Sequence, residues 1–315
     1  MRTTTLGTTG ITVTELCFGA SPIGSIPGLY SHPVDEDSGV ATVEAVLASP
    51  IRFIDTSNGY GPNGESERRI GAALSRTGGL PDDVVIASKV DPAHGETDFS
   101  GDRVRRSLEE SLERLGLDRI PLLHLHDAER ISFEEGVAPD GPMRALVDLK
   151  ARGLVDAIGV ASGPVPLIRR YVDTGEFDVV LSHNRFTLLD RSAEGLYRVC
   201  RERGVGVLNA APYGGGILSQ GPEAVPRYAY GQGSAAAVEA ARAIAAACER
   251  AGVPLAAAAL QFSLRSDLVD STVVGMSSPK RLAETESLAA AAVPDALWEE
   301  LESLVPDRSA WLDPS

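Results

Sequence analysis

Short apolar runs alternate with amphipathic segments along the whole chain. The apolar runs are rich in Val, Ile and Leu and have the length of buried parallel strands. They predict strands at Leu16–Gly19, Phe53–Asp55, Val84–Lys89, Leu122–His126, Ala157–Val160, Val179–Ser182, Val205–Asn209 and Ser271–Val274. The segments between them repeat their apolar residues at helical spacing. They predict helices at Asp37–Leu47, Ser66–Leu74, Val104–Leu115, Met143–Arg152, Val165–Asp173, Ala193–Arg203 and Ser234–Leu264.

Eight strands that are each followed by a helical segment predict an α/β fold, a (β/α)8 barrel. A last helix pair, Pro279–Ala291 and Asp295–Leu304, follows the final strand. The opening TTTLGTTGITVTEL alternates around Gly7 and Gly10 and predicts a small N-terminal β-hairpin. No stretch has the composition of a linker, so we expect residues 1–315 to form a single domain.

Glycine and proline mark the predicted helix ends and one long loop. A glycine just past a helix suits a left-handed C-cap. The glycines in such positions are Gly153, Gly175, Gly204 and Gly252. The segment 219–233, SQGPEAVPRYAYGQG, follows the seventh strand and is rich in Pro, Gly and Tyr. We expect it to be a loop at the active site.

The composition is that of a globular protein with an acidic surface: 315 residues, 43% of them hydrophobic. The net charge of −15 argues against binding to nucleic acid, because the phosphates would be repelled. Cys17, Cys200 and Cys248 are scattered and form neither a disulfide framework nor a zinc motif. The N-terminus has no long apolar segment, and no other apolar stretch is long enough to cross a bilayer. We therefore expect a cytoplasmic protein without membrane contact.

Four residues could surround a single reacting carbonyl group: Asp55, Tyr60, Lys89 and His126. Asp55, Lys89 and His126 end predicted strands, and such ends open on one face of a parallel barrel. A free phenol titrates near pH 10, but a neighbouring ammonium favours the phenolate, and Asp55 would keep that ammonium charged. Tyr60 could then exchange a proton with an oxygen that His126 orients. Because no side chain supplies a hydride, this chemistry requires a redox cofactor.

The segments that carry these residues resemble those of the aldo-keto reductases. The similar segments are FIDTSNGYG, VVIASKV, IPLLHLHDAE, VDAIGVAS, LNAAPYGGGILSQG and STVVGMSSPKRLAE. They occur in the family's order and cover essentially the whole chain. The resemblance implies a (β/α)8 barrel that binds a nicotinamide cofactor across its carboxyl face without a Rossmann fingerprint. It also implies that Asp55, Tyr60, Lys89 and His126 are the catalytic tetrad.

By the same resemblance, the nicotinamide end of the cofactor site departs from the common pattern. The family usually has Ser-Asn after the fifth strand, whereas here Ser162 is followed by Gly163. His183 stands where a glutamine usually reaches the carboxamide. Ala210 stands where an aromatic ring often stacks, with Pro212 and Tyr213 beside it. These residues are expected to line the nicotinamide site.

At the adenosine end the resemblance points to the segment VVGMSSPKRLAET. Members that prefer NADP generally place a cation just after the last strand, where this chain has Gly275, Met276 and Ser277. Arg281 could still pair with a 2′-phosphate. Glu284 matches a position that contacts the adenine amino group. The missing cations favour NAD as the cofactor, with NADP as the alternative.

The phrases NRFTLLDR, NAAPYGGGIL and ALQFSLRSDLVDSTVVGMSSP look most like the aldose dehydrogenase branch of the family. That branch includes D-threo-aldose, L-fucose, L-galactose and pyridoxal 4-dehydrogenases. The resemblance implies oxidation of a cyclic hemiacetal at C1 to the lactone with NAD, on a small sugar of the L-fucose, L-galactose or D-arabinose type. Candidate substrate contacts are Tyr30, Asn58, His124, His183, Asn184, Arg185 and Trp311. The protein is expected to be a monomer or homodimer.

Four alternatives remain open. His124 and His126 are two residues apart on a strand and point the same way, as in the HxH pair of barrel metallohydrolases. Stoichiometric zinc in the purified protein would support that hydrolase, although no metal is expected. A second alternative is a nicotinamide-binding regulatory subunit, which turnover of an aldose would exclude. Within the enzymes, the alternatives are an NADPH-dependent aldehyde or ketone reductase and a pyridoxal 4-dehydrogenase.

Overall fold

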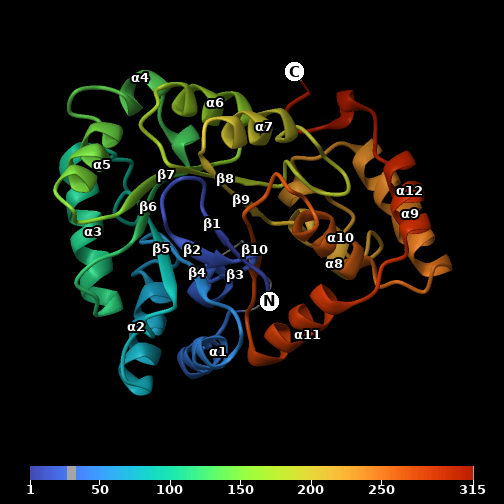
Figure 1. Ribbon diagram of the computed structural model, residues 1–315, viewed down its shortest axis with the longest axis horizontal. Helices are drawn as coiled ribbons and strands as arrows, with labels where there is room; N and C mark the ends of the chain where they lie inside the picture. The colour runs from blue at the N-terminus through green and yellow to red at the C-terminus, as the bar shows by residue number, and fades with distance from the viewer. Residues whose placement is uncertain (27–32, 315) are drawn as a thin grey trace.

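The computed structural model describes residues 1–26 and 33–314, and its centre is a closed barrel of parallel strands (Figure 1). The strands are β3 (Leu16–Gly19), β4 (Phe53–Asp55), β5 (Val85–Val90), β6 (Leu122–His126), β7 (Ala157–Ser162), β8 (Val179–His183), β9 (Gly206–Ala210) and β10 (Ser271–Gly275). Neighbours along the chain pair in parallel, and β10 closes the barrel by pairing with both β9 and β3. The predicted (β/α)8 barrel is confirmed, and the predicted strand bounds differ from the observed ones by about one or two residues.

Helices surround the barrel because each returns the chain from the carboxyl end of one strand to the amino end of the next. The α-helices are α1 (Glu36–Ala48), α2 (Glu65–Thr77), α3 (Gly101–Leu115), α4 (Phe133–Gly136), α5 (Pro142–Ala151), α6 (Val165–Asp173), α7 (Glu194–Glu202), α8 (Ile217–Gln220), α9 (Ala235–Arg250), α10 (Leu255–Leu264), α11 (Pro279–Ala290) and α12 (Asp295–Ser303). Short 3-10 helices are η1 (Ser21–Gly24), η2 (Ala128–Arg130), η3 (Gly214–Gly216), η4 (Ala229–Gly231) and η5 (Arg308–Ala310). Figure 1 shows α1, α2, α3 and α5 around one side of the barrel and α8, α9, α10 and α12 on the other.

The predicted helix Ser234–Leu264 is wrong in one respect, because the structure divides it into α9 and α10. Gly252 adopts a left-handed φ of +65° after α9, and Pro254 is the N-cap of α10. Because proline lacks an N–H and restricts the residue before it, the chain starts a new helix there. Gly153, Gly175 and Gly204 also have positive φ at their helix ends, as predicted.

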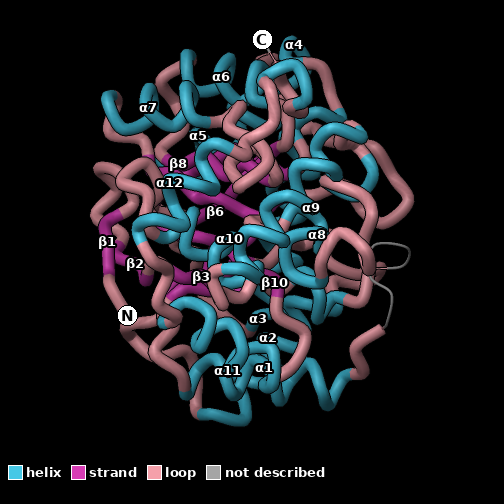
Figure 2. Tube along the Cα trace, turned by 90° about the vertical axis from the view of Figure 1, so that its right-hand side faces the viewer, coloured by secondary structure: helices cyan, strands magenta, loops and turns pink. Residues whose placement is uncertain are grey.

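No single helix in the described ranges 1–26 and 33–314 is long and apolar enough to cross a membrane. Helices α9 and α10 reach that length and composition together, but they are bent by 103° relative to each other. Figure 2 shows these two helices grouped with α8 and α12 on one face of the molecule. The group encloses a core of its own that contains Ala237, Ala241, Ala247, Ala257 and Ala258. Their small side chains let the helices pack closely.

An antiparallel hairpin, β1 (Thr3–Thr5) and β2 (Thr12–Thr14), closes the amino end of the barrel, as the sequence predicts. Leu6 and Val13 are buried in one cluster with inward-facing side chains of the barrel strands. The hairpin turn binds the chain just before β9, because the Thr8 N–H donates to the Gly204 carbonyl (2.9 Å). Gly7 is required in this turn, since its φ is +49° and a Cβ would lie 2.2 Å from that carbonyl oxygen. Because the hairpin covers the amino end of the barrel, a functional site is expected at the carboxyl ends of the strands.

Candidate active site

Lys89 lies at the centre of the predicted tetrad, and its side chain is about 1% exposed. Its Nζ lies 2.7 Å from Asp55 Oδ2, 2.7 Å from the Thr56 carbonyl oxygen and 3.0 Å from the Tyr60 hydroxyl oxygen. An ammonium group has three N–H donors, so all three are used. The structure therefore brings Asp55, Lys89 and Tyr60 into direct contact at the carboxyl end of the barrel.

The local fold explains why these three side chains meet. Strands β4 and β5 pair in parallel, which places Asp55 beside Ala87 and leaves Lys89 just beyond it along β5. After β4 the chain turns back, with the Asn58 N–H donating to the Lys89 carbonyl (3.2 Å). Helix η1 covers the turn so closely that a Cβ on Gly24 would lie 2.7 Å from the Tyr60 carbonyl oxygen. The loop after β4 therefore folds back over the end of the strand and brings the Tyr60 hydroxyl to Lys89.

His126 ends β6 and faces Tyr60, with the ring centroids 5.5 Å apart and the rings nearly perpendicular (77°). Its Nδ1 lies 2.8 Å and 2.9 Å from the two carboxylate oxygens of Asp91. Burial favours the neutral imidazole, but the Asp127 and Asp91 carboxylates outweigh it and raise the pKa of His126. Sequence reasoning missed Asp91, although it directly follows β5 and so stands at the same strand ends as the tetrad.

His124 lies deeper in the barrel than predicted for a substrate contact, because its side chain is completely buried. Within residues 1–26 and 33–314 neither of its ring nitrogens has a hydrogen-bond partner. Burial, and next the charge of Lys89, hold the pKa of His124 well below its usual range. The ring fits because β7 has a glycine beside it: a Cβ on Gly159 would lie 2.1 Å from His124 Nδ1. His124 is therefore a neutral residue of the barrel interior.

Ser162 and His183, both predicted for the nicotinamide end, lie at the ends of the neighbouring strands β7 and β8, and Ala210 ends β9. Ser162 Oγ donates to Glu129 Oε2 (2.6 Å), and the Gly163 N–H donates to the other oxygen of that carboxylate (3.3 Å). Glu129, in η2, was not predicted, because nothing in the sequence places η2 over β7. Burial, and next the charge of Arg185, lower the pKa of His183, so its ring is held neutral.

Arg185 occupies the space that Gly163 leaves open. A Cβ on Gly163 would lie 2.8 Å from Arg185 Nη1. The side chain of Arg185 is about 6% exposed, and its Nε lies 3.1 Å from Asp313 Oδ2. Asp313 also accepts the Val165 N–H at the start of α6 (3.0 Å). The C-terminal tail thus fastens a guanidinium beside the predicted carboxamide site.

The segments predicted to hold the cofactor contain polar atoms that fit a missing polar ligand. Among the described residues, Asn184 Oδ1 and the Tyr213 hydroxyl are buried without a hydrogen-bond partner. Buried polar groups are normally paired, so such atoms are typical of a site that a ligand completes. Burial raises the pKa of Tyr213 to about 12, although the charge of Arg281 opposes this. Tyr213 is therefore near enough to α11 for the charge of Arg281 to act on its hydroxyl.

At the predicted adenosine end, Gly275 closes β10 and Ser277 follows before α11. The side-chain oxygen of Ser278 caps α11 by accepting the Arg281 N–H (3.2 Å). Arg281 Nη1 lies 2.9 Å from Glu284 Oε2, so the two residues predicted for this end are paired with each other. Both side chains are exposed, and such a pair contributes little stability.

Other predicted substrate contacts have different neighbours. The side-chain amide of Asn58 donates to the Ser107 carbonyl (3.1 Å) and to Glu110 Oε2 (3.0 Å), so it faces α3 and not the barrel mouth. Asn184 has a left-handed φ of +61°, and its amide nitrogen lies 3.1 Å from His183 Nδ1. Tyr30 lies outside the described residues.

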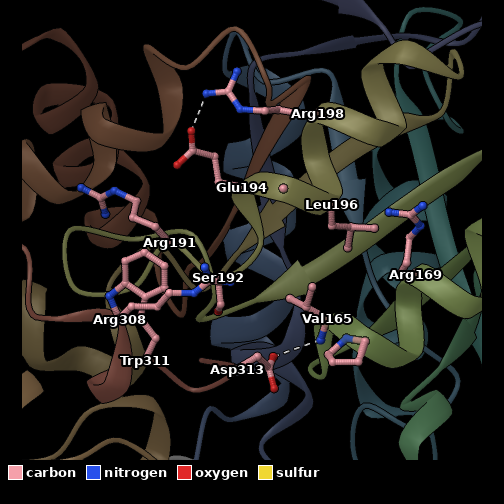
Figure 3. A pocket seen from close by; sticks show the side chains of 12 residues that line it. Val165, Arg169, Arg191, Ser192, Glu194, Leu196, Arg198, Arg308, Trp311 and Asp313 are labelled. Carbon is pink, nitrogen blue, oxygen red and sulfur yellow. Dashed lines mark hydrogen bonds and ion pairs between the residues drawn. The ribbon is translucent and has the colours of Figure 1, made fainter. Parts of the chain in front are cut away.

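Trp311 lines a pocket of about 420 Å³ between the starts of α6 and α7 and the C-terminal tail (Figure 3). Arginines surround it: Arg169, Arg191, Arg198 and Arg308. Three of them are already paired, Arg198 with Glu194 (2.5 Å), Arg169 with Asp173 (2.9 Å) and Arg191 with Glu302 (3.5 Å). No residue of the predicted tetrad lines this pocket, so it is separate from the Lys89 cluster.

Within the described part of the chain, no group of three or more His, Cys, Asp or Glu side chains is arranged to hold a metal ion. His126 Nδ1, one of the nitrogens that an HxH metal pair would offer, is bonded to Asp91 instead.

Comparisons with known proteins find similar chains along nearly the whole length of this one. Residues 15–306 match the sequence profile described as the Aldo/keto reductase family. The chain is 35% identical to D-threo-aldose 1-dehydrogenase of a Pseudomonas species, covering 93% of this chain and 94% of that protein. It is 36% identical to L-galactose dehydrogenase of Arabidopsis thaliana, with 89% and 85% covered. It is 30% identical to pyridoxal 4-dehydrogenase of Microbacterium luteolum, with 95% and 96% covered.

Among solved structures, the chain is similar to an aldo-keto reductase from Bacillus halodurans in its holo form. The TM-score is 0.78 at 25% identity, and the match covers 97% of this chain and 96% of that one. The fold is therefore shared along nearly the full length of both chains.

Proposed function

Because the chain belongs to the Aldo/keto reductase family, we propose that it is a NAD-dependent dehydrogenase that oxidises C1 of an aldose to the lactone. The family makes it an oxidoreductase that acts on CH–OH or carbonyl groups with a nicotinamide cofactor. The observation that carries the proposal is the contact of the Tyr60 hydroxyl with the buried Lys89 ammonium (3.0 Å). Two aldose dehydrogenases among the relatives, at 35% and 36% identity, support the substrate class.

Tyr60 is the proposed base for the sugar hydroxyl. The Lys89 ammonium stabilises negative charge on the phenolic oxygen, and Asp55 holds the ammonium in place (2.7 Å). The phenolate takes the proton of the anomeric hydroxyl as the C1–H bond breaks. When bound, the nicotinamide supplies the acceptor for the hydride from C1, which completes a two-electron oxidation. His126 hydrogen-bonds the same oxygen and orients it.

NAD is the proposed cofactor, with NADP as the alternative. A 2′-phosphate needs an available cation, but Arg281 is already paired with Glu284, and Ser277 is neutral. The net charge of −15 further disfavours the more negative dinucleotide. For the residues around the carboxamide, Ser162 and His183 are proposed as contacts, with Arg185 in the space beside Gly163. A cytoplasmic location stays a prediction.

The test is a screen of aldoses, including L-fucose, L-galactose and D-arabinose, against NAD and NADP, followed by absorbance at 340 nm. We expect turnover with at least one aldose and NAD, and a product that hydrolyses from a lactone to an aldonate. The Tyr60→Phe variant is the control for background oxidation. Turnover of aromatic aldehydes with NADPH but of no aldose with NAD would replace this proposal with that of a reductase.

Pyridoxal is a second candidate substrate, because pyridoxal 4-dehydrogenase is also among the relatives, at 30% identity over nearly the full length. Pyridoxal forms a cyclic hemiacetal, so the same proton transfer by Tyr60 would give a lactone. Including pyridoxal in the screen distinguishes the two substrate classes directly.

A further inference from the structure

We propose that Asp91 is a positioning residue that fixes the tautomer of His126 and, at the same time, holds the turn that carries Tyr60. Its role in turnover rests on the proposed function, whereas the tautomer it imposes does not. Asp91 belongs to no part of the predicted tetrad. Its carboxylate nevertheless contacts both sides of the site.

The carboxylate of Asp91 lies in a fully formed pocket of donors and is about 5% exposed. His126 Nδ1 lies 2.8 Å from one oxygen, and the Gly59 N–H donates to the other at 2.9 Å. The Ser57 hydroxyl also donates to that second oxygen. The imidazole of His126 contacts both oxygens, since its Nδ1 also lies 2.9 Å from the second one, and that second oxygen is shared with the β4–α2 turn.

The backbone around Asp91 is fixed as well. Its N–H donates to Ser107 Oγ (3.2 Å), and Arg103 Nε donates to its carbonyl oxygen (2.8 Å). Both partners belong to α3, and Arg103 is itself held by Glu110 (2.7 Å). The carboxylate is therefore attached to a helix and a strand end, and not to a free loop.

This arrangement settles which nitrogen of His126 faces the site. An ionised carboxylate only accepts hydrogen bonds, so Nδ1 must carry a proton. Burial opposes ionisation of Asp91, but the charge of His126 and the hydrogen bonds from His126, Ser57 and Gly59 outweigh it and lower its pKa. Nε2 is then the nitrogen left for a substrate oxygen. Asp127 Oδ1 lies 3.6 Å from this nitrogen.

The second oxygen of Asp91 accepts the Gly59 N–H, and Gly59 directly precedes Tyr60 in the chain. A Cβ at Gly59 would lie 2.7 Å from the Asp91 carboxyl carbon, so the backbone and the carboxylate approach more closely than a side chain would permit. Movement of Asp91 would shift the residue before Tyr60 as well as the ring of His126. One carboxylate therefore positions both His126 and Tyr60, the two residues proposed to contact the substrate oxygen.

Asp91→Ala tests this inference because it removes both acceptor oxygens that face His126 Nδ1. The Ser57 hydroxyl lies 3.0 Å from Nδ1, and without its carboxylate acceptor it can donate to that nitrogen instead. We expect His126 to change to the Nε2–H tautomer, with 15N shifts of the histidine ring reversed relative to wild type. His126→Gln identifies the signal among the five histidines.

In the same variant we expect kcat to fall at least tenfold, while NADH affinity by fluorescence titration stays within about twofold. The groups that act on this titration are Asp91 and Lys89 on the β5 side, Asp127 and His124 on the β6 side, and Tyr60 from the β4–α2 turn, with His183 from β8. The imidazole should therefore titrate at lower pH once the Asp91 charge is removed. Asp98→Ala, at an exposed carboxylate of the same β5–α3 segment, is the matched control and should change none of these readouts.

Ser57→Ala is the second variant, for the case in which Asp91→Ala fails to fold. It removes one donor from the carboxylate and should lower kcat in the same direction but less. An unchanged tautomer in a folded Asp91→Ala protein would overturn the inference. Failure of every aldose in the wild-type screen, with the tautomer change intact, would instead overturn the proposed function.

Discussion

A buried lysine is the residue on which the site depends. Three oxygens surround the Lys89 ammonium, and only one of them carries a formal charge. Removing one partner of a buried ion pair typically costs about 3–5 kcal/mol, because the other charge is left without compensation. Substituting Lys89 or Asp55 would therefore lower stability as well as activity, so a loss of activity in such a variant would not by itself show a chemical role. Tyr60 is different, because its hydroxyl can be removed without leaving a new unpaired charge.

For Tyr60→Phe we expect kcat to fall by about 10²–10⁴-fold, the usual contribution of a positioned acid or base. The melting temperature and the affinity for NADH should stay close to wild type, since the aromatic ring remains beside Lys89. Steady-state kinetics with the best aldose of the screen and a fluorescence titration measure the two quantities. Near wild-type turnover would remove Tyr60 from its proposed role.

Gly159→Ala tests the packing of the neutral histidine inside the barrel. The added methyl group would lie 2.1 Å from His124 Nδ1, so we expect a loss of about 1–3 kcal/mol in the free energy of unfolding. If the clash with this ring is the cause, His124→Ala should recover part of the loss in the double variant. Urea denaturation of the two single variants and the double variant gives the coupling energy. Strict additivity would assign the loss to the Val179 carbonyl, which is 3.0 Å away.

For single residues, the sequence predicted the position of those side chains that lie at the carboxyl ends of strands. Asp55, Lys89 and His126 could be placed together because parallel strands bring their carboxyl ends to one face. Asp91 follows the same rule but is a single Asp after a strand, which is also typical of a turn. Arg185 and Asp313 could not be paired from sequence, because they are 128 positions apart and the course of the C-terminal tail sets their contact.

Among the elements, the turn from β10 into α11 is where cofactor preference should be decided. Ser278 caps the helix, so the residue before it, Ser277, can change without loss of the cap. Arg281 is one turn further on and is paired with Glu284. Arg281 must give up its ion pair with Glu284 to bind a 2′-phosphate, whereas a new arginine at position 277 would have no such pair to break.

For Ser277→Arg we expect kcat/KM with NADP to rise by about tenfold or more, as a new charge-assisted hydrogen bond would give. The value for NAD should change much less. Ser277→Gln is the matched control, with similar length and no charge, and should leave the NADP/NAD ratio near wild type. Equal effects on both dinucleotides would mean that this segment does not contact the 2′ position.

Helix boundaries were predictable where periodicity was uninterrupted, and Val165–Asp173 was predicted with its observed bounds. The division of α9 from α10 was missed because Ala-rich helical composition continues across Pro254 and hides the break. The orientation of the Asn58 side chain could not be predicted from the sequence either. Its amide points toward Ser107 and Glu110 of α3. Such contacts depend on how a helix packs over a loop, and no local pattern specifies them.

For the whole molecule, two histidines predict opposite dependences of stability on pH. The pKa of His124 is lowered, so acidification below about 6.5 protonates this residue in the unfolded chain but not in the folded one. The pKa of His126 is raised, so its contribution is complete below about 6.5 and is lost as pH rises through the folded pKa. Together they favour a stability maximum near pH 6.5.

We expect the melting temperature of His124→Leu to depend less on pH than wild type between about pH 5 and 6.5. The slope removed should correspond to at most about 1.4 kcal/mol per pH unit, the value for one proton. Thermal unfolding at a series of pH values gives this difference between variant and wild type. Parallel curves for the two proteins would show that His124 titrates alike in the folded and unfolded states, against the lowered pKa.

The hairpin beneath the barrel has one more consequence. Its apolar side chains, Leu6 and Val13, keep solvent from entering at the end opposite to the tetrad. A substitution that loosened the hairpin would admit water from below and raise the local dielectric constant around the lysine. The attraction between the ammonium and its carboxylate would weaken, although no barrel strand had moved. A remote, non-polar change could in this way alter the acidity of the phenol.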